Sequence, residues 1–126
     1  LESGVTSAHA EVMALALAQR ALGRWDLGAN GDRLTLVVNW RPCVQCYGAT
    51  MWSGVRALVV AGDGDLLEEL TGFDEGPMVD DWAEQFERRG IRVTSGVGYD
   101  DAVAVYRAYG ASDAVVYNAR GAVEAD

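Results

Sequence analysis

Apolar runs and amphipathic stretches alternate along the 126 residues of the chain. Short runs rich in Leu, Val and Ile are typical of buried strands, whereas apolar residues that recur every three or four positions are typical of helices. The runs predict strands at 33–39, 55–62 and 91–96, with a final extended piece at 114–118. The helical spacing predicts helices at 8–22, 42–53, 65–70, 78–90 and 100–110.

Residues that begin and end helices agree with this pattern. Thr6 or Ser7 can cap the first helix, because a side-chain oxygen there accepts an N–H that has no partner within the helix. Gly23 and Gly90 follow helical stretches, and glycine readily adopts the left-handed backbone found at helix ends. Pro42 suits the first turn of the second helix, where its missing N–H would have no partner anyway.

Strands that alternate with helices predict an α/β fold with a partly parallel sheet. A chain of this length fits one hydrophobic core, so we expect residues 1–126 to form a single domain. The first predicted element is a helix with no strand before it, and three strands make a narrow sheet for so many helices. We therefore expect strands that belong upstream of this sequence to be missing from it.

The chain is acidic, and all of its basic side chains are arginines. Ten Arg, no Lys and 19 acidic residues give a formal net charge of −9. Nucleic-acid binding relies on a basic surface, so a long DNA or RNA partner is disfavoured. No apolar stretch is long enough to span a membrane, and the start has no secretory pattern. We therefore expect a cytoplasmic protein with no membrane partner.

The only histidine and the only two cysteines stand in two short motifs. His9 begins the sequence His-Ala-Glu, while Cys43 and Cys46 follow Pro42 in the sequence Pro-Cys-x-x-Cys. Two thiolates and one imidazole suit Zn²⁺, and three protein ligands leave its fourth position open for water. Glu11 lies two residues after His9, close enough to move protons at that position. The two motifs together are typical of zinc deaminases.

Each motif has a simpler interpretation when it is taken alone. A Cys-x-x-Cys pair can be a redox-active dithiol. His9 can be an ordinary surface histidine, and Glu11 a solvated carboxylate. A closed structural zinc site would need a fourth protein ligand, but the sequence has no other Cys or His. The two motifs in this order favour the open zinc site over these alternatives.

Longer segments around the motifs resemble the cytidine-deaminase superfamily and, more narrowly, bacterial guanine-deaminase-like nucleoside or base deaminases. HAEVMAL, at 9–15, is similar to the first zinc motif, and RPCVQCYGATMWSGVRALVVAG, at 41–62, resembles the second motif with the helix and strand that follow. TGFDEGP, at 71–77, and VVYN, at 115–118, resemble segments of the guanine-deaminase branch. The resemblance implies a three-layer α/β/α sandwich with a mixed, partly parallel sheet.

The resemblance also implies roles for residues outside the two motifs. Glu75 would be a second carboxylate for proton transfer, with Asp74 as the neighbouring alternative. Trp52 would line the base pocket, and a buried core position is the equally weighted alternative. Ala10 and Tyr117 are expected beside the bound base.

Two features depart from the family pattern. Family members carry an Asn upstream of the His-x-Glu motif that contacts the substrate, and this sequence does not contain that segment. Arg41 stands where the family usually has Glu, which changes the charge beside the metal motif and leaves the substrate open.

The function implied by the resemblance is zinc-dependent hydrolytic deamination of a small nucleobase or nucleoside. His9, Cys43 and Cys46 would bind Zn²⁺, Glu11 would carry protons, and guanine would be converted to xanthine and ammonia. Adenosine deamination in transfer RNA and deamination of another aminopurine or aminopyrimidine are alternatives, although the carboxyl end lacks a basic tail. An inactive zinc-binding module is a third interpretation. The resemblance further implies a homodimer.

Overall fold

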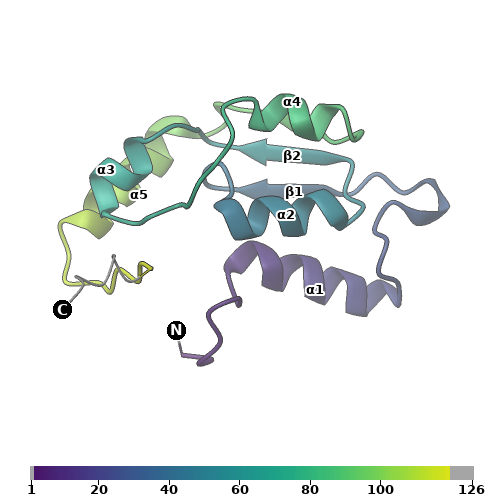
Figure 1. Ribbon diagram of the computed structural model, residues 1–126, viewed down its shortest axis with the longest axis horizontal. Coiled ribbons are helices and arrows are strands. Elements are labelled where there is room, and N and C mark those ends of the chain that lie inside the picture. Colours follow the sequence, from purple (N-terminus) through teal and green to yellow (C-terminus); the bar gives the residue numbers. More distant parts are fainter. Residues whose placement is uncertain (1, 120–126) are drawn as a thin grey trace, which may run out of the picture.

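The computed structural model describes residues 2–119, which form a parallel sheet with helices packed against it (Figure 1). The strands are β1 (Thr35–Val38), β2 (Ala57–Val60) and β3 (Arg92–Thr94). The helices are α1 (Ala10–Leu22), α2 (Val44–Trp52), α3 (Leu66–Thr71), α4 (Trp82–Glu87) and α5 (Tyr99–Gly110), with a 3-10 helix, η1, at Ala29–Gly31. Every predicted helix and strand is present with somewhat different ends, whereas residues 114–118 belong to no strand.

The sheet has the order β1-β2-β3, and both pairs of neighbouring strands are parallel. Thr35, Ala57 and Arg92 lie side by side at its amino-terminal edge. The predicted α/β class is therefore confirmed. Among residues 2–119 the sheet contains parallel strands alone, so the mixed character expected of it is not formed by this part of the chain.

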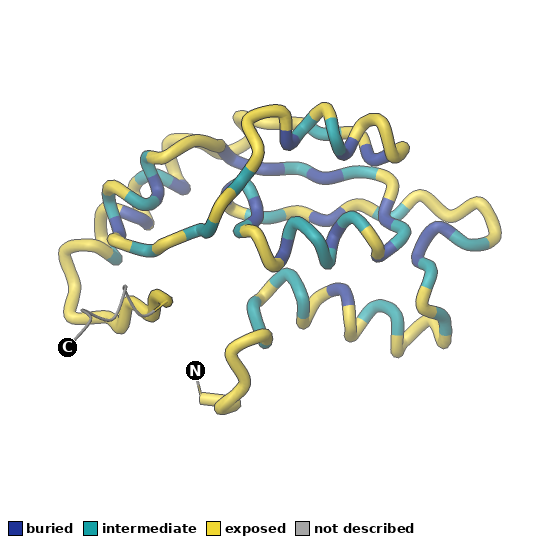
Figure 2. Tube along the Cα trace, in the orientation of Figure 1, coloured by how far each residue is buried: buried dark blue, intermediate teal, exposed yellow. Residues whose placement is uncertain are grey.

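One face of the sheet carries the hydrophobic core. Two successive right-handed crossovers in the same direction bring α2 and α4 to the same face of the sheet. Leu58 and Val60 of β2 are fully buried there, together with Phe86 of α4. Figure 2 shows the buried segments along the strands and the neighbouring sides of these helices. On the other face Val37 is 69% exposed, so the third layer of the expected sandwich is not formed within residues 2–119.

Helix α2 begins two residues later than its sequence predicts. Cys43 has an extended backbone, with φ −64° and ψ 171°, so the helix starts at Val44 and Pro42 lies outside it. Cys43 is therefore the residue at the helix cap, while Cys46 lies in the first turn.

A second, smaller core lies beyond the carboxyl ends of the strands. Trp40 packs edge-on against Tyr106 of α5, and Leu67 of α3 is buried in the same cluster. These contacts hold α3 and α5 next to the loop that leads into α2. None of the helices described for this chain is both long enough and apolar enough to cross a membrane.

Candidate metal centre and its pocket

The amino-terminal ends of α1 and α2 bring the two sequence motifs together. His9 is the cap residue of α1, and Cys43 is the cap residue of α2. The two helices pack against each other, as Figure 1 shows. Helix amino ends carry unpaired N–H groups and partial positive charge, which favour thiolates and other anions. The local fold therefore places three ligand-type side chains where negative charge is stabilised.

The geometry of these side chains fits a tetrahedral metal ion. His9 Nδ1 lies 3.4 Å from Cys43 Sγ and 3.5 Å from Cys46 Sγ, and the three ligand atoms all lie within 4.8 Å of one another. Ordinary zinc bond lengths and tetrahedral angles place such nitrogen and sulfur atoms about 3.6 Å apart. Cys46 is fully buried, and both cysteines are free thiols. The donor set and its spacing therefore suit Zn²⁺.

Glu11 lies beside the ligands without being needed as one. Its Oε2 is 3.5 Å from Cys46 Sγ. A carboxylate at this distance can exchange protons with a molecule bound at the open position of the metal. The structure therefore places Glu11 beside the three ligand-type side chains.

The two thiols have opposite pKa shifts. A hydrogen bond from the Cys46 side chain, with backbone hydrogen bonds from Cys46 and Gln45, lowers the pKa of Cys43 to about 5 despite its burial. The pKa of Cys46 is raised, because Cys46 is the donor in that bond, because it is buried, and because Glu11 is close. Cys43 is therefore the more acidic of the two thiols.

The loop that carries Glu75 is fastened directly to the start of α2. The carbonyl oxygen of Glu75 accepts a hydrogen bond from the backbone N–H of Val44 at 2.9 Å. The Glu75 N–H in turn donates to Oε1 of Glu68 at 2.9 Å. Gly76 has φ +79°, and a Cβ at this position would lie 2.5 Å from Cγ1 of Val44. Only glycine therefore allows this close approach of the loop to the metal centre.

Burial dominates the ionisation of Glu75. It raises the pKa of the carboxyl to about 7, with a further contribution from Cys43, against the opposing effect of Arg41. A carboxyl with this pKa is present in both protonation states near neutral pH. It can therefore act as a proton donor or as an acceptor under those conditions.

The carboxyl-terminal segment folds back over the same site. The hydroxyl of Tyr117 lies 3.4 Å from His9 Nε2, and the ring of Tyr117 packs edge-on against Phe73. Because His9 Nδ1 faces the thiols, Nε2 is left to carry the proton and to donate to the Tyr117 hydroxyl. Tyr117 thus fixes the orientation of a metal-ligand side chain.

Asn118 fastens this segment to the Glu75 loop. Its Oδ1 accepts a hydrogen bond from the N–H of Asp74 at 2.8 Å, and its Nδ2 donates to the carbonyl oxygen of Gly72 at 2.9 Å. The hydroxyl of Tyr109 donates to the carbonyl oxygen of Val115 at 2.6 Å, which holds the segment after α5 against that helix. One side chain therefore joins two segments more than 40 residues apart in sequence.

These elements surround a pocket of about 780 Å³. Two polar groups in its wall have buried atoms without a hydrogen-bond partner in the described part of the chain, namely Nε of Arg41 and the hydroxyl of Tyr106. The volume falls within the ordinary range for small-molecule sites. A polar ligand can supply the missing partners.

The structure brings most of the predicted site residues to this pocket. Its lining includes the following residues singled out from the sequence: His9, Ala10, Glu11, Cys43, Asp74, Glu75 and Tyr117. Cys46 completes the metal cluster from the buried side. Arg41, whose charge beside the metal motif the sequence already indicates, also lines the pocket. Two further residues were missed from the sequence, namely Tyr106, which stands in no recognisable motif, and Asn118, which ends the VVYN segment but was given no role.

Trp52 is not brought to the pocket. Cys46 and Thr50 lie four residues apart on the buried face of α2, and Trp52 follows two residues later, on the opposite side of the helix. Its side chain is 74% exposed. The predicted place in the base pocket is therefore not formed within the described residues, and the alternative of a buried core position is wrong.

Comparison with known proteins agrees with this arrangement. Residues 2–62 match the family described as the cytidine and deoxycytidylate deaminase zinc-binding region. A probable cytosine deaminase of Schizosaccharomyces pombe is 34% identical over 68 residues, which cover 54% of this chain and 38% of that protein.

Solved structures give longer matches. The guanine deaminase from Nitrosomonas europaea is 47% identical with a TM-score of 0.80, over 85% of this chain and 59% of that chain. NE0047 in complex with 2,6-diaminopurine is 49% identical with a TM-score of 0.80, over 88% of this chain and 59% of that chain. A transfer-RNA A34 deaminase, at 21% identity and a TM-score of 0.57, shares the fold.

The chain spans about 59% of the length of the guanine deaminase and 38% of the length of the cytosine deaminase. The matched region includes both metal motifs, and the geometry of His9, Cys43 and Cys46 fits the metal that this family region binds. Residues 2–62 therefore match the zinc-binding region of the cytidine and deoxycytidylate deaminases, and the chain resembles guanine deaminases over most of its length.

Proposed function

We propose that this chain carries the catalytic centre of a zinc-dependent purine deaminase, with guanine as the substrate and xanthine and ammonia as products. The observation that supports this most is the pairing of the metal cluster with two carboxylates, Glu11 and Glu75, in the wall of one pocket. The pocket is large enough for a purine. The Nitrosomonas europaea protein is a guanine deaminase, and NE0047 has been seen with 8-azaguanine and 2,6-diaminopurine.

The roles of the residues follow from their positions. His9, Cys43 and Cys46 hold Zn²⁺, which when bound acidifies water so that hydroxide is available at neutral pH. Glu11 accepts the proton that the attacking water loses and delivers it to the ring nitrogen next to the reacting carbon. One water is consumed: its first proton goes through Glu11 to the ring nitrogen, and its second restores the proton that Glu75 gives to the departing amine. The carbon–nitrogen bond breaks to release ammonia, and a ring carbonyl remains.

Glu75 serves the leaving amine in this proposal. Deamination needs a proton at the departing nitrogen, and a carboxyl with a pKa of about 7 can hold one near neutral pH. Its loop is fixed to Val44 and Glu68, so the carboxyl is held in place before the substrate arrives. Asp74 instead accepts a hydrogen bond from the N–H of Gly76 at 2.8 Å, which gives it a role in shaping the loop. Glu75 is therefore the better proton donor of the two.

The substrate contacts come from the unpartnered groups of the pocket wall. The Tyr106 hydroxyl and the Arg41 guanidinium can hydrogen-bond the carbonyl oxygen and ring nitrogens of a purine. Tyr117 and Phe73 present aromatic surface to the same space. A purine offers both polar edges and an aromatic face, so it suits this combination of groups.

We propose further that the enzyme is a cytoplasmic homodimer and that residues 1–126 belong to one domain. A reducing compartment keeps Cys43 and Cys46 available as ligands. The exposed sheet face around Val37 leaves apolar surface for further protein to cover. Light scattering of the purified protein measures the assembly, and a monomer at all concentrations would overturn this part of the proposal.

The test of the function is ammonia release from a panel of substrates by the zinc-loaded protein. The panel contains guanine, guanosine, adenine, adenosine, cytosine and cytidine, and Glu11→Ala is the control variant. We expect release from guanine that is lost in Glu11→Ala. Release from a different compound would keep the chemistry and overturn the substrate. Zinc binding with no release from any compound or from transfer RNA would favour an inactive module.

A further inference from the structure

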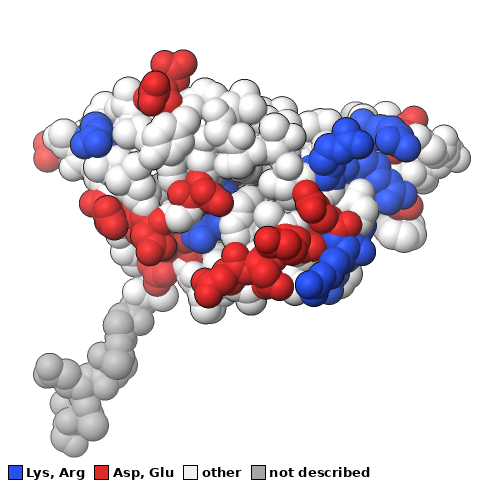
Figure 3. Space-filling model, turned by 90° about the horizontal axis from the view of Figure 1, so that it is seen from above, with Lys and Arg blue, Asp and Glu red and all other residues white. Residues whose placement is uncertain are grey.

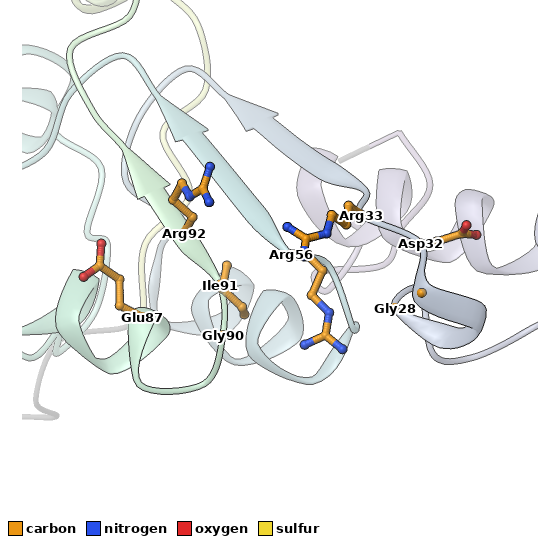
Figure 4. A pocket seen from close by; sticks show the side chains of 9 residues that line it. Gly28, Asp32, Arg33, Arg56, Glu87, Gly90, Ile91 and Arg92 are labelled. Carbon is orange, nitrogen blue, oxygen red and sulfur yellow. The ribbon is translucent and has the colours of Figure 1, made fainter.

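Three arginines line a cleft at the amino-terminal edge of the sheet, far from the metal centre in the fold. The cleft has a volume of about 540 Å³, and its lining includes Arg33, Arg56 and Arg92 (Figure 4). It shares no lining residue with the pocket at the metal centre. The cleft is therefore separate from the pocket at the metal centre.

The strands place these arginines at one end of the sheet. Arg56 immediately precedes β2 and Arg92 begins β3, while Arg33 lies two residues before β1. The N–H of Arg56 donates to the carbonyl oxygen of Leu34 at 2.9 Å, and the N–H of Arg92 donates to the carbonyl oxygen of Arg56 at 3.0 Å. Neighbouring strands lie about 4.8 Å apart. Arg92 stands opposite Ala57, one position after Arg56, so Arg33 and Arg92 start on one face of the sheet and Arg56 starts on the other. All three side chains line the cleft at this end of the strands.

Arg56 is held in place by two glycines. A Cβ on Gly28 would lie 3.0 Å from Nε of Arg56 and 2.6 Å from the carbonyl oxygen of Gly54. A Cβ on Gly90 would lie 3.4 Å from Nη1 of Arg56. The guanidinium thus fits against bare backbone on both sides. A side chain packed in this way loses less conformational freedom when it binds a ligand.

The positive charge of the cleft is not neutralised by the protein. The single ion pair within residues 2–119 joins Arg24 to Asp32 at the rim. Glu87 also lines the cleft, yet no carboxylate of the described residues forms an ion pair with any of the three arginines. The chain has 19 acidic residues for ten arginines, so free guanidinium groups are not the expected arrangement. Figure 3, which views the molecule from above, shows that most of the basic side chains visible on this face lie toward one end of the molecule.

We propose that this cleft binds the phosphate group of a small phosphorylated molecule. Guanidinium groups donate in a fixed fork that matches phosphate oxygens, and each arginine of the cleft can supply one such fork. Gly31 and Gly90 are exposed and have no side chain, so a phosphate group can come close to the backbone there. The volume accommodates a nucleotide as well as a free phosphate ion.

The test is a titration followed by backbone amide shifts in the NMR spectrum of the zinc-loaded protein. The probes are inorganic phosphate, guanosine monophosphate and guanosine, which lacks the phosphate. We expect phosphate and the monophosphate to shift the amides of Gly28, Gly90 and Ile91 in a saturable way. Guanosine should leave the chemical shifts of these amides unchanged, because any binding at the metal centre occurs at the other end of the strands.

Variants assign the binding to the guanidinium groups. Arg56→Gln should raise the Kd for phosphate about tenfold, since it removes charge-assisted hydrogen bonds. The double variant Arg33→Gln/Arg92→Gln should weaken binding further and leaves the packing of Arg56 against the glycines intact. Arg107→Gln, an equal charge change on α5, should have no effect.

The outcomes separate the possible ligands and can overturn the proposal. Equal affinities for phosphate and guanosine monophosphate would identify the phosphate group alone as the ligand. Tighter binding of the monophosphate, with additional shifted amides along the cleft, would identify a nucleotide. The proposal is wrong when neither probe produces saturable shifts at Gly28 and Gly90, or when folded Arg33→Gln/Arg92→Gln protein binds as tightly as the Arg107→Gln control.

Discussion

Replacing Asn118 by Ala removes both hydrogen bonds that join the carboxyl-terminal segment to the Glu75 loop. A hydrogen bond contributes a net of about 0.5–1.5 kcal/mol, and these two are exposed, so their joint loss should cost about 1–2 kcal/mol. That change corresponds to a roughly 5–30-fold larger open population of the loop. Because Glu75 follows Asp74 directly, kcat/KM for guanine should fall in proportion to the fraction of molecules in which the loop remains closed.

Hydrogen exchange at the Asp74 amide measures this effect directly, because that N–H is the donor to Asn118 Oδ1. Its protection should fall by the same factor in Asn118→Ala, while the amide of Leu58 in the central strand keeps its protection. Asn118→Asp retains the acceptor for Asp74 but loses the donor to Gly72, so it should show a smaller loss. Unchanged protection at Asp74 in Asn118→Ala would refute the claim that Asn118 holds the Glu75 loop in place. An equal loss of protection at Leu58 would indicate general unfolding.

Three further changes probe the site. Cys46→Ala should abolish stoichiometric Zn²⁺ binding, measured by metal analysis after dialysis, because it removes one of three ligands; full retention would contradict the assigned ligand set. Deamination should decline above about pH 7 as Glu75 loses its proton, and Glu75→Gln should remove this decline at high pH from the pH profile. Folding raises the pKa of Glu75 from 4.5 to about 7. The stabilising contribution of the protonated carboxyl is therefore lost as the pH rises from 4.5 to about 7. Tyr106→Phe should raise KM for guanine about tenfold without lowering the melting temperature, because the hydroxyl has no partner within residues 2–119; a lower melting temperature with unchanged KM would assign Tyr106 to packing alone.

The metal centre could be predicted from the sequence because each half of it is local. His9 and Glu11 lie within one helical turn, and so do Cys43 and Cys46. The residue types define the metal, and the strand between the motifs lets both helices start at the same edge of the sheet. The predicted α/β class follows from the same alternation of apolar runs and amphipathic stretches.

Contacts between distant segments could not be predicted in this way. Asn118 contacts Gly72 and Asp74. Both segments resemble the guanine-deaminase branch, but they carry no periodic pattern that predicts which of their residues meet. The position of Trp52 was predictable in principle, because helical geometry separates it from the buried face that holds Cys46 and Thr50. The resemblance implied that Trp52 lines the base pocket, but residues 2–119 form no pocket around Trp52.

The parallel sheet explains why the two functional ends of the molecule are chemically opposite. Each crossover returns the chain to the same amino-terminal edge, so the residues that precede the strands collect there, including Arg56 and Arg92. The residues that follow β1 collect at the carboxyl edge, where Cys43 meets His9. No side chain lines both sites, and the core of the sheet lies between them. Charge changes at the arginine cleft should therefore leave Zn²⁺ content unchanged, and a metal loss in folded Arg33→Gln/Arg92→Gln protein would show that the two ends are coupled through the strands.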